Sequence, residues 1–349
     1  MAVIMLGKHV IGPDQPPFII AELSGNHDQS LDKALLMVEA AAKCGADAIK
    51  LQTYTPDTIT LNLHQNEFFI DNPDSLWHGS SLYSLYQQAM TPWEWHKPLF
   101  DKAKELGMLA FSSPFDLTAV DYLEQLDVPC YKIASFENID HGLIAAVART
   151  GKPVIISTGM ATQVELAEAV EVLQHNGCRD IILLKCTSNY PARPIDANLH
   201  TIPHLAALFG CQVGLSDHTA GIGVSVAAVA LGATVIEKHF VLDRSEGGID
   251  AAFSMEPAEF SLLVSECRKA KDALGKVHYG CTEKEIASRI HRRSLYIAKD
   301  MQAGDIFTAD NLRSVRPGLG LPPKYLTQFL GRQVKKNVTM GTPLSWELI

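Results

Sequence analysis

Two histidines and two lysines carry the strongest chemical signal in this sequence. His218, in GLSDHT, and His239, in IEKHF, each end a short apolar run that is typical of a buried strand. If the two runs are neighbouring strands about 4.8 Å apart, both imidazoles reach one point beyond the strand ends. Two neutral imidazoles can hold a divalent metal and leave most of its coordination sphere open, as a Lewis acid requires. Two satisfied structural histidines are the alternative interpretation.

Lys50 and Lys132 lie late in two further apolar runs. A buried lysine costs several kcal/mol unless an anion accompanies it. Internal ion pairs with Glu22 or Glu237 would meet that need. Phosphate or carboxylate binding, or a Schiff-base nucleophile, are the functional alternatives. Hydroxyl side chains at the ends of other runs favour the phosphate interpretation; they are Ser135, Ser157, Thr158 and Ser216.

Two further charged residues stand in positions that chemistry could use. Glu137, in KIASFEN, directly follows an apolar run and is either a general base or a solvated loop carboxylate. Arg316, in RPGLG, is framed by proline and glycine near the C-terminus. Position alone assigns neither of them a role.

Eight short apolar or β-branched runs alternate with segments of helical periodicity. The runs are 18–23, 47–52, 108–113, 130–135, 153–158, 180–186, 212–217 and 234–240. This alternation predicts a parallel α/β fold, and eight strands close a (β/α)8 TIM barrel. A doubly wound sheet competes, but no strand–GxGxxG–helix unit is present. Most runs end in a polar side chain, as expected when a site is built at the carboxyl ends of barrel strands.

The 349 residues exceed the roughly 250 that a barrel needs. We predict a catalytic barrel over residues 1–275, a polar linker over 276–292 and a small β-rich domain over 293–349. Residues 53–90 form a long, aromatic insertion after the second run, suited to a loop that covers a substrate.

Composition excludes several classes of protein. Hydrophobic residues make up 47% of the chain, enough for a large core, and the net charge of −9 argues against nucleic-acid binding. The seven cysteines contain no CxxC pair, so we expect free thiols in a reducing compartment. The N-terminus lacks a signal-peptide pattern and no apolar run is long enough to span a membrane. We therefore expect a cytoplasmic protein without a membrane partner.

Ten segments resemble, in order, the sialic acid synthase family, whose members join a barrel to a C-terminal antifreeze-like (SAF) domain of the β-clip type. They are AELSGNHDQS, IKLQTY, FSSPFD, YKIASFE, ISTGMAT, KCTSNYP, GLSDHT, IEKHF, RSLYIAKDMQAGDIFT and RPGLGL. The resemblance covers nearly the whole chain. It implies a transferase that condenses phosphoenolpyruvate with an amino-sugar aldehyde and water, giving a nine-carbon nonulosonic acid and phosphate.

The resemblance also implies roles for individual residues. His218 and His239 would hold Mn2+, or a similar ion such as Mg2+ or Co2+, and Glu137 would be the base for the attacking water. The residues around phosphoenolpyruvate would be Lys50, Ser113, Lys132, Ser135, Ser157, Ser188 and Ser216. Glu22 would join the catalytic set, and the residues near the sugar would be Gln52, Tyr190, Asp250 and Arg316. Arg316 would reach the site from a second subunit, in a domain-swapped homodimer.

One departure bears on the sugar. Many family members have Asn after Cys-Thr where this chain has Ser188, followed by Asn189. With TPWEWHKPLF and KIASFE, this change resembles the branch that uses 2,4-diacetamido-2,4,6-trideoxy-L-altrose. The same chemistry on a D-manno-type sugar, as in N-acetylneuraminate or legionaminate synthesis, is the alternative.

Two more distant alternatives remain. A Schiff-base aldolase would use Lys132 or Lys185 and need no metal. A non-catalytic carbohydrate-binding protein would keep the barrel without its chemistry, although His218, His239 and Glu137 are all retained.

Overall fold

A computed structural model describes residues 2–349 of the chain. The chain divides into two compact units, residues 1–275 and residues 276–349. Among the residues described, no helix has the length and apolar character needed to cross a membrane. The seven cysteines are free thiols, and six of them are buried.

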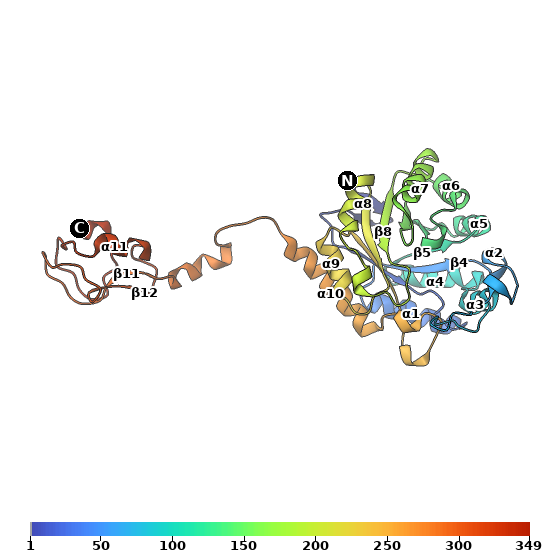
Figure 1. The fold of residues 1–349 in the computed structure, drawn as a ribbon, viewed down its shortest axis with the longest axis horizontal. Helices are drawn as coiled ribbons and strands as arrows, with labels where there is room; N and C mark the ends of the chain where they lie inside the picture. The colour runs from blue at the N-terminus through green and yellow to red at the C-terminus, as the bar shows by residue number, and fades with distance from the viewer. Residues whose placement is uncertain (1) are drawn as a thin grey trace. The chain divides into compact units, whose positions relative to one another are not determined.

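The first unit is a closed barrel of eight parallel strands, in the order β10-β3-β4-β5-β6-β7-β8-β9 (Figure 1). The strands are β3 (Phe18–Glu22), β4 (Ala48–Thr53), β5 (Leu109–Pro114), β6 (Tyr131–Ile133), β7 (Val154–Ser157), β8 (Ile181–Cys186), β9 (Gln212–Asp217) and β10 (Val235–His239). Each strand falls on one of the eight predicted runs, to within two residues at its ends. The prediction of a TIM barrel is confirmed.

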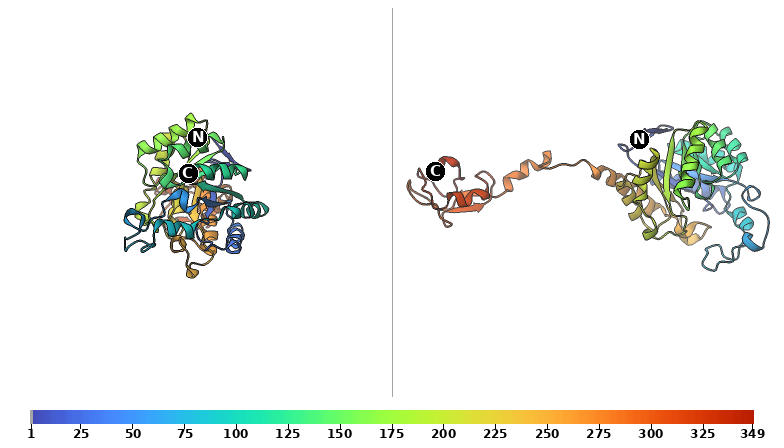
Figure 2. Two further views of the ribbon diagram at one scale, coloured as in Figure 1. Left: turned by 90° about the vertical axis from the view of Figure 1, so that its right-hand side faces the viewer. Right: turned by 45° about the horizontal axis from the view of Figure 1, so that its top comes forward.

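Helices follow the strands and cover the outside of the barrel (Figure 2). They are α1 (Leu31–Lys43), α4 (Trp93–Glu105), α5 (Leu117–Gln125), α6 (His141–Arg149), α7 (Gln163–His175), α8 (Thr201–Phe209), α9 (Gly223–Ala230) and α10 (Pro257–Leu274). Several of these helices have a side-chain cap at their N-terminus. Ser30 accepts from the Lys33 amide at the start of α1, and Thr162 and Glu165 form a capping box on α7. Such caps satisfy amides that have no partner within the helix.

The barrel interior is so crowded that one strand position must be glycine. A Cβ at Gly214 of β9 would lie 2.2 Å from the Val235 carbonyl oxygen and 2.6 Å from a Leu184 methyl. The neighbouring strands β8 and β10 can therefore approach β9 closely at this level.

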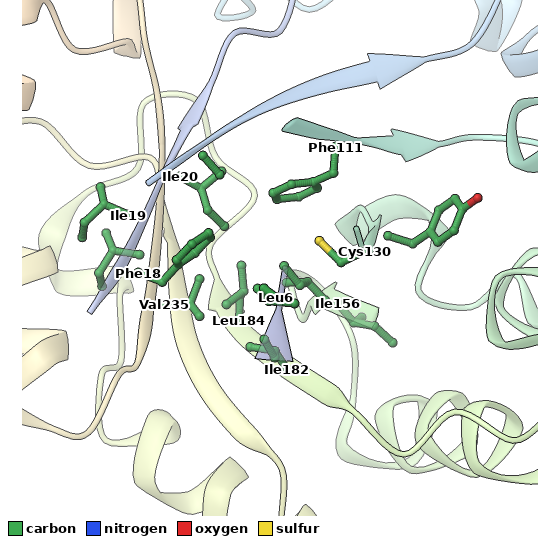
Figure 3. Packing of buried hydrophobic residues seen from close by; sticks show 14 of the residues in the cluster. Leu6, Phe18, Ile19, Ile20, Phe111, Cys130, Ile156, Ile182, Leu184 and Val235 are labelled. Atoms are coloured by element: carbon green, nitrogen blue, oxygen red, sulfur yellow. The ribbon is translucent and has the colours of Figure 1, made fainter. Parts of the chain in front are cut away.

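An N-terminal hairpin closes the amino end of the barrel, and it was not predicted. Strands β1 (Ile4–Leu6) and β2 (His9–Ile11) pair antiparallel. Leu6 is fully buried, and Figure 3 shows it beside Ile182 and Leu184 of strand β8. The side chain of Gln212, the first residue of β9, donates to the Ala2 carbonyl at 2.7 Å.

The predicted insertion follows β4 and contains α2 (Pro56–Ile59), the 3-10 turn Asn66–Phe68 and α3 (Leu82–Ala89). It begins where β4 leaves the barrel, at the carboxyl end of that strand (Figure 1). The other short turns of this unit are the 3-10 segments Ser135–Glu137, Pro194–Asp196, Arg244–Glu246 and Ala251–Phe253.

The second unit has its own small core. Strands β11 (Ser294–Ile297) and β12 (Leu312–Val315) pair antiparallel, and α11 (Leu326–Phe329) follows. Phe307 and Phe329 meet edge-on, with ring centroids 5.9 Å apart, among buried aliphatic side chains. Short 3-10 turns occupy Glu283–Glu285, Ala287–His291, Pro323–Tyr325 and Trp346–Leu348. Two of these turns lie within the stretch predicted as a linker.

Candidate active site

Four charged side chains meet inside the barrel, near the carboxyl ends of its strands. Lys50 is ion-paired with Glu22, the residue beside it on the neighbouring strand. The Lys132 Nζ lies 3.3 Å from one oxygen of Glu237, and the Lys50 Nζ lies 3.9 Å from the other. All four side chains are almost completely buried. The internal ion pairs, which were one interpretation of the sequence, are therefore present. They hold the two lysines where an anionic ligand could bind.

The pKa values in this cluster follow from burial and from the mutual charges. Burial raises the pKa of Glu22 against the opposing effect of Lys50. For Glu237, burial is outweighed by Lys132 and Lys50, which bring its pKa down to about 2. Burial lowers the pKa of Lys132, which Glu237 partly offsets. A buried cluster of this kind has little free charge of its own, and its geometry is set before any ligand arrives.

Hydroxyl groups surround the lysines. Lys132 donates to the Ser157 hydroxyl at 2.7 Å and Lys50 to the Ser113 hydroxyl at 3.4 Å. The Ser216 hydroxyl donates to Glu237 at 2.9 Å. The structure thus brings together Lys50, Lys132, Ser113, Ser157 and Ser216, five of the residues expected around phosphoenolpyruvate.

The two other serines of that set lie against the loop after β7. The Gly159 amide donates to the Ser135 hydroxyl at 3.2 Å. A Cβ at Gly159 would lie 2.1 Å from the Ser188 Oγ and 2.6 Å from the Ser135 Oγ. Ser135 and Ser188 therefore approach the same point, and a side chain at position 159 would occupy it.

The two histidines lie side by side, with ring centroids 5.2 Å apart. The Nδ1 of His218 lies 3.0 Å from the Thr187 carbonyl oxygen, which can only accept, so this nitrogen carries a proton. In the neutral ring, Nε2 is then the acceptor. The Nδ1 of His239 is buried without a hydrogen-bond partner and lies 4.0 Å from an Asp250 oxygen. Burial, together with nearby positive charge that includes Lys50 and Lys132, lowers the pKa of His239 well below its ordinary value, so this imidazole is neutral at pH 7.

This arrangement fits a divalent cation with an open coordination sphere. A neutral, buried imidazole without a hydrogen-bond partner, next to a second imidazole with a free Nε2, is a suitable donor pair. Within residues 2–349, no group of three or more His, Cys, Asp and Glu side chains forms a ready metal cluster. The protein would therefore supply few ligands, and substrate and water would fill the rest.

Three of the four residues expected near the sugar belong to the barrel unit, and two of them, Tyr190 and Asp250, lie beside the histidines. Gln52 donates to Glu22 at 3.0 Å. The Tyr190 ring lies 4.6 Å from the His218 ring. Asp250 accepts from the Ser24 hydroxyl at 2.5 Å, and burial raises its pKa.

Glu137 is separate from the ion-pair cluster. It belongs to the 3-10 turn after β6, and one of its carboxylate oxygens is buried without a hydrogen-bond partner. Burial raises its pKa to about 7, against weaker opposing effects that include the charge of Lys132. A carboxyl group that titrates near neutral pH is suited to proton transfer.

Arg316 belongs to the second unit and is exposed. Its loop is held from both sides: the Gly318 amide donates to the Ile290 carbonyl at 2.7 Å, and the Ser294 hydroxyl donates to the Pro317 carbonyl at 2.7 Å. The loop therefore presents the guanidinium on a fixed backbone.

An ion pair outside the barrel wall was missed from the sequence. Lys238 and Asp217 are both about 1% exposed, and their charged atoms are 2.8 Å apart. Lys238 also donates to the Thr219 carbonyl at 2.6 Å, and Asp217 accepts from the Thr219 amide at 2.9 Å. These bonds hold the backbone on both sides of His218 and tie β9 to β10. Alternation along a strand places Lys238 and Asp217 on the outer face, but the segments GLSDHT and IEKHF do not by themselves show that the two strands pair.

The barrel and its small C-terminal unit have the architecture of sialic acid synthase structures. In a comparison with solved structures, the N-acetylneuraminic acid synthetase from Leptospira borgpetersenii serovar Hardjo-bovis matches with a TM-score of 0.72 and 34% identity, covering 82% of this chain and 95% of that one. The chain belongs to the NeuB family, which it matches over residues 37–279, and a SAF domain matches residues 292–349. The resemblance seen in the sequence motifs is confirmed.

Two relatives with known names show which members of the family the chain resembles in sequence. The chain is 46% identical over 331 residues to a pseudaminic acid synthase of Campylobacter jejuni subsp. jejuni serotype O:23/36 (strain 81-176), covering 95% of this chain and 96% of the relative. It is 36% identical over 323 residues to an N,N'-diacetyllegionaminic acid synthase of Campylobacter jejuni subsp. jejuni serotype O:2 (strain ATCC 700819 / NCTC 11168). That match covers 91% of this chain and 96% of the relative.

Lys238→Met should lower the free energy of unfolding of the barrel by about 3–5 kcal/mol, because it leaves the buried Asp217 carboxylate without its cation. Urea denaturation would measure the change. Lys97→Met is the matched control, since Lys97 pairs with Asp101 at 2.8 Å on the surface, where both side chains are exposed. That variant should change stability by less than about 1 kcal/mol. Equal effects of the two substitutions would contradict a structural role for the buried pair.

Proposed function

We propose that this protein is a pseudaminic acid synthase. It would condense phosphoenolpyruvate with 2,4-diacetamido-2,4,6-trideoxy-L-altrose and water, giving pseudaminic acid and phosphate. The observation that carries the proposal is the meeting of two buried lysines and two adjacent histidines at the carboxyl end of one barrel. Membership of the NeuB family supports the reaction class.

Phosphoenolpyruvate would bind over the lysine cluster. Lys50 and Lys132 supply positive charge, and Ser113, Ser157 and Ser216 are within hydrogen-bond distance of the charged groups. Ser135 and Ser188 would add hydroxyls from the loops after β6 and β8. Hydrogen bonds between charged groups and phosphate oxygens are short and strong in such a dry site.

The sugar would bind beside the histidines, with Gln52, Tyr190 and Asp250 around it. We propose Mn2+, or a similar divalent ion, as the cofactor of His218 and His239. When bound, such an ion polarises a substrate carbonyl oxygen. The barrel residues hold the alkene carbon C3 of phosphoenolpyruvate against the sugar aldehyde, where the new carbon–carbon bond forms. Water then adds at C2, and phosphate leaves with cleavage of its bond to C2.

Glu137 is proposed as the base that takes the proton from the attacking water. Its unpartnered buried oxygen and its pKa of about 7 support that role. Glu22 is proposed as a second catalytic carboxyl, since burial raises its pKa and it contacts both Lys50 and Gln52.

The choice of sugar rests on the comparisons. Identity is 46% to a pseudaminic acid synthase, against 36% to the legionaminic acid relative and 34% to the N-acetylneuraminic acid enzyme. Ser188 agrees with the same branch. N-acetylneuraminate or legionaminate synthesis is the alternative, with the same chemistry on another sugar.

We further propose a domain-swapped homodimer in the cytoplasm, in which Arg316 of one subunit reaches the sugar in the other. The barrel rim offers apolar side chains for such a contact. Phe136, Ile139, Met160 and Ile195 follow β6, β7 and β8 and are 58%, 59%, 62% and 80% exposed. Exposed apolar residues that gather on one face are typical of an interaction surface. The free cysteines are compatible with a reducing compartment.

The function is tested by phosphate release from phosphoenolpyruvate with Mn2+, offering the L-altrose derivative and N-acetylmannosamine separately. We expect turnover with the altrose sugar, loss of it with EDTA, and recovery when Mn2+ is restored. Turnover with N-acetylmannosamine alone would keep the chemistry and overturn the choice of sugar. Activity that survives EDTA, together with borohydride trapping of pyruvate on the protein, would favour the Schiff-base alternative.

The pH dependence tests Glu137 separately. A base with a pKa of about 7 is mostly protonated below pH 6, so kcat should rise as the pH passes through 7. Glu137→Gln should lower kcat by about 10²–10⁴ and remove this rise. The same substitution should raise the thermal stability above pH 7, because a buried carboxyl with a raised pKa costs stability once it is ionised. An unchanged pH profile in Glu137→Gln would exclude the residue as the base.

A further inference from the structure

Residues 69–81 of the insertion form a compact turn with its own hydrogen bonds. The Ile70 backbone makes two of them: its amide donates to the Ser80 carbonyl, and its carbonyl accepts from the Gly79 amide, each at 2.9 Å. The Asp74 amide donates to the Asn72 side chain at 3.0 Å. The segment NPDS thus folds as a turn of the kind that its residue types favour. Leu76 and Trp77 follow this turn, in a backbone that is locally fixed.

Trp77 ties the turn to the loop after β10. Its indole N–H donates to the Ile249 carbonyl oxygen at 3.0 Å, a contact between residues 172 positions apart. Ile249 is adjacent to Asp250, whose carboxylate lies 4.0 Å from His239. The insertion is therefore attached directly to the segment that carries a proposed sugar ligand.

An aromatic series extends from Trp77 to the histidines. The Trp77 ring lies 6.2 Å from the Tyr190 ring, and Tyr190 lies 4.6 Å from His218 and 5.1 Å from Phe253. Phe253 in turn lies 4.9 Å from His239. Trp77 is thus the outermost member of a continuous aromatic wall that begins at the proposed metal ligands.

A cavity of about 440 Å³ opens at the outer end of this wall, where Trp77 lines it. Its lining residues are Asp28, Gln29, Leu76, Trp77, Gln88, Gly248 and Ile249. Gly248 has a φ of +117°, and a Cβ there would lie 3.2 Å from Asp28 Oδ1, so glycine lets this loop approach Asp28 closely. The cavity is large enough for part of a substituted sugar, and it joins apolar and polar side chains.

We infer that Trp77 is a specificity-determining residue, and that the cavity it lines takes the end of the sugar that bears the C4 acetamido group and the C6 methyl group. The inference rests on the proposed function. The indole N–H is already used by Ile249, so Trp77 offers the ligand only an apolar face. A methyl group gains from that face, whereas a hydroxyl in its place loses a hydrogen bond to water and finds no donor there.

The bond from Trp77 to Ile249 fixes the insertion near residue 77, and the proposed role in specificity gives a reason for that. A specificity wall must keep its position relative to the reacting carbonyl, because a misplacement of about 1 Å can cost a hundredfold in rate. The bond to Ile249 fixes the indole against the same loop that carries Asp250. Sugar selection and sugar orientation would then depend on one rigid contact.

The test compares steady-state kinetics of the full-length Mn2+ enzyme and of three variants with the L-altrose derivative. Trp77→Ala should raise the KM for this sugar about tenfold or more, as loss of a small apolar contact does, and leave the KM for phosphoenolpyruvate within twofold. It should also narrow the preference, measured by kcat/KM, for this sugar over N-acetylmannosamine. Trp77→Phe keeps an apolar face but loses the bond that fixes the ring, so its preference should lie between those of the wild type and of Trp77→Ala. Leu61→Ala is the matched control, since Leu61 is 60% exposed in the same insertion and does not line the cavity.

An unchanged KM for the sugar in Trp77→Ala would overturn the inference, and so would equal increases in both KM values. A general loss of structure in Trp77→Ala would appear in its thermal unfolding. Trp77→Phe would then decide, because a folded Trp77→Phe enzyme with no preference left for the altrose sugar would contradict an apolar-face role. Failure of the wild-type enzyme to use the altrose sugar would instead contradict the proposed function.

Discussion

The site depends on keeping two lysines charged inside a barrel that excludes water. A lone buried ammonium group would lose its proton, so each lysine lies close to a carboxylate on a neighbouring or facing strand. Lys50 has Glu22, and Lys132 has Glu237, with Lys50 shared between the two glutamates. The pairs come from three places in the sequence more than 80 residues apart, and only barrel closure brings them together.

Barrel geometry extends this constraint to the rest of the site. Strand residues alternate between inside and outside, so Glu237 and His239 face the barrel interior while Lys238 between them faces outward. On the outside Lys238 meets Asp217, the residue before His218. The same two strands therefore carry the inner glutamate, both histidines and the ion pair that holds their backbones. Gly214, lower on β9, lets the strands approach closely enough for this arrangement.

The sequence was informative where the chemistry is periodic and less so where it depends on contacts across space. The eight strands and the clustering of Lys50, Lys132, His218 and His239 could be predicted, because apolar runs that end in functional side chains identify the carboxyl end of a barrel. The N-terminal hairpin could not, because three-residue strands carry too short an alternation to be recognised.

Two other features lay beyond pattern reading for different reasons. Lys238 and Asp217 look like ordinary charged neighbours of the histidines until the strands are paired, and only then is their burial evident. The bond from Trp77 to Ile249 spans 172 positions, and nothing local in the insertion specifies its partner. The roles expected of Glu137 and Arg316 came from the resemblance to the family. The structure shows in addition that a Glu137 oxygen is buried and that Arg316 is exposed.

The most direct test of the central claim is the dissociation constant of phosphoenolpyruvate, measured by calorimetry without sugar. The comparison is between the wild-type protein and a double variant, Lys132→Met with Glu237→Gln, which removes one positive and one negative charge and so keeps the barrel interior balanced. If the paired lysines bind the phosphate or carboxylate, affinity should fall at least about thirtyfold, since a buried charged contact contributes about 2–5 kcal/mol. A dissociation constant within about threefold of wild type, in a variant with an unchanged circular dichroism spectrum, would contradict the account.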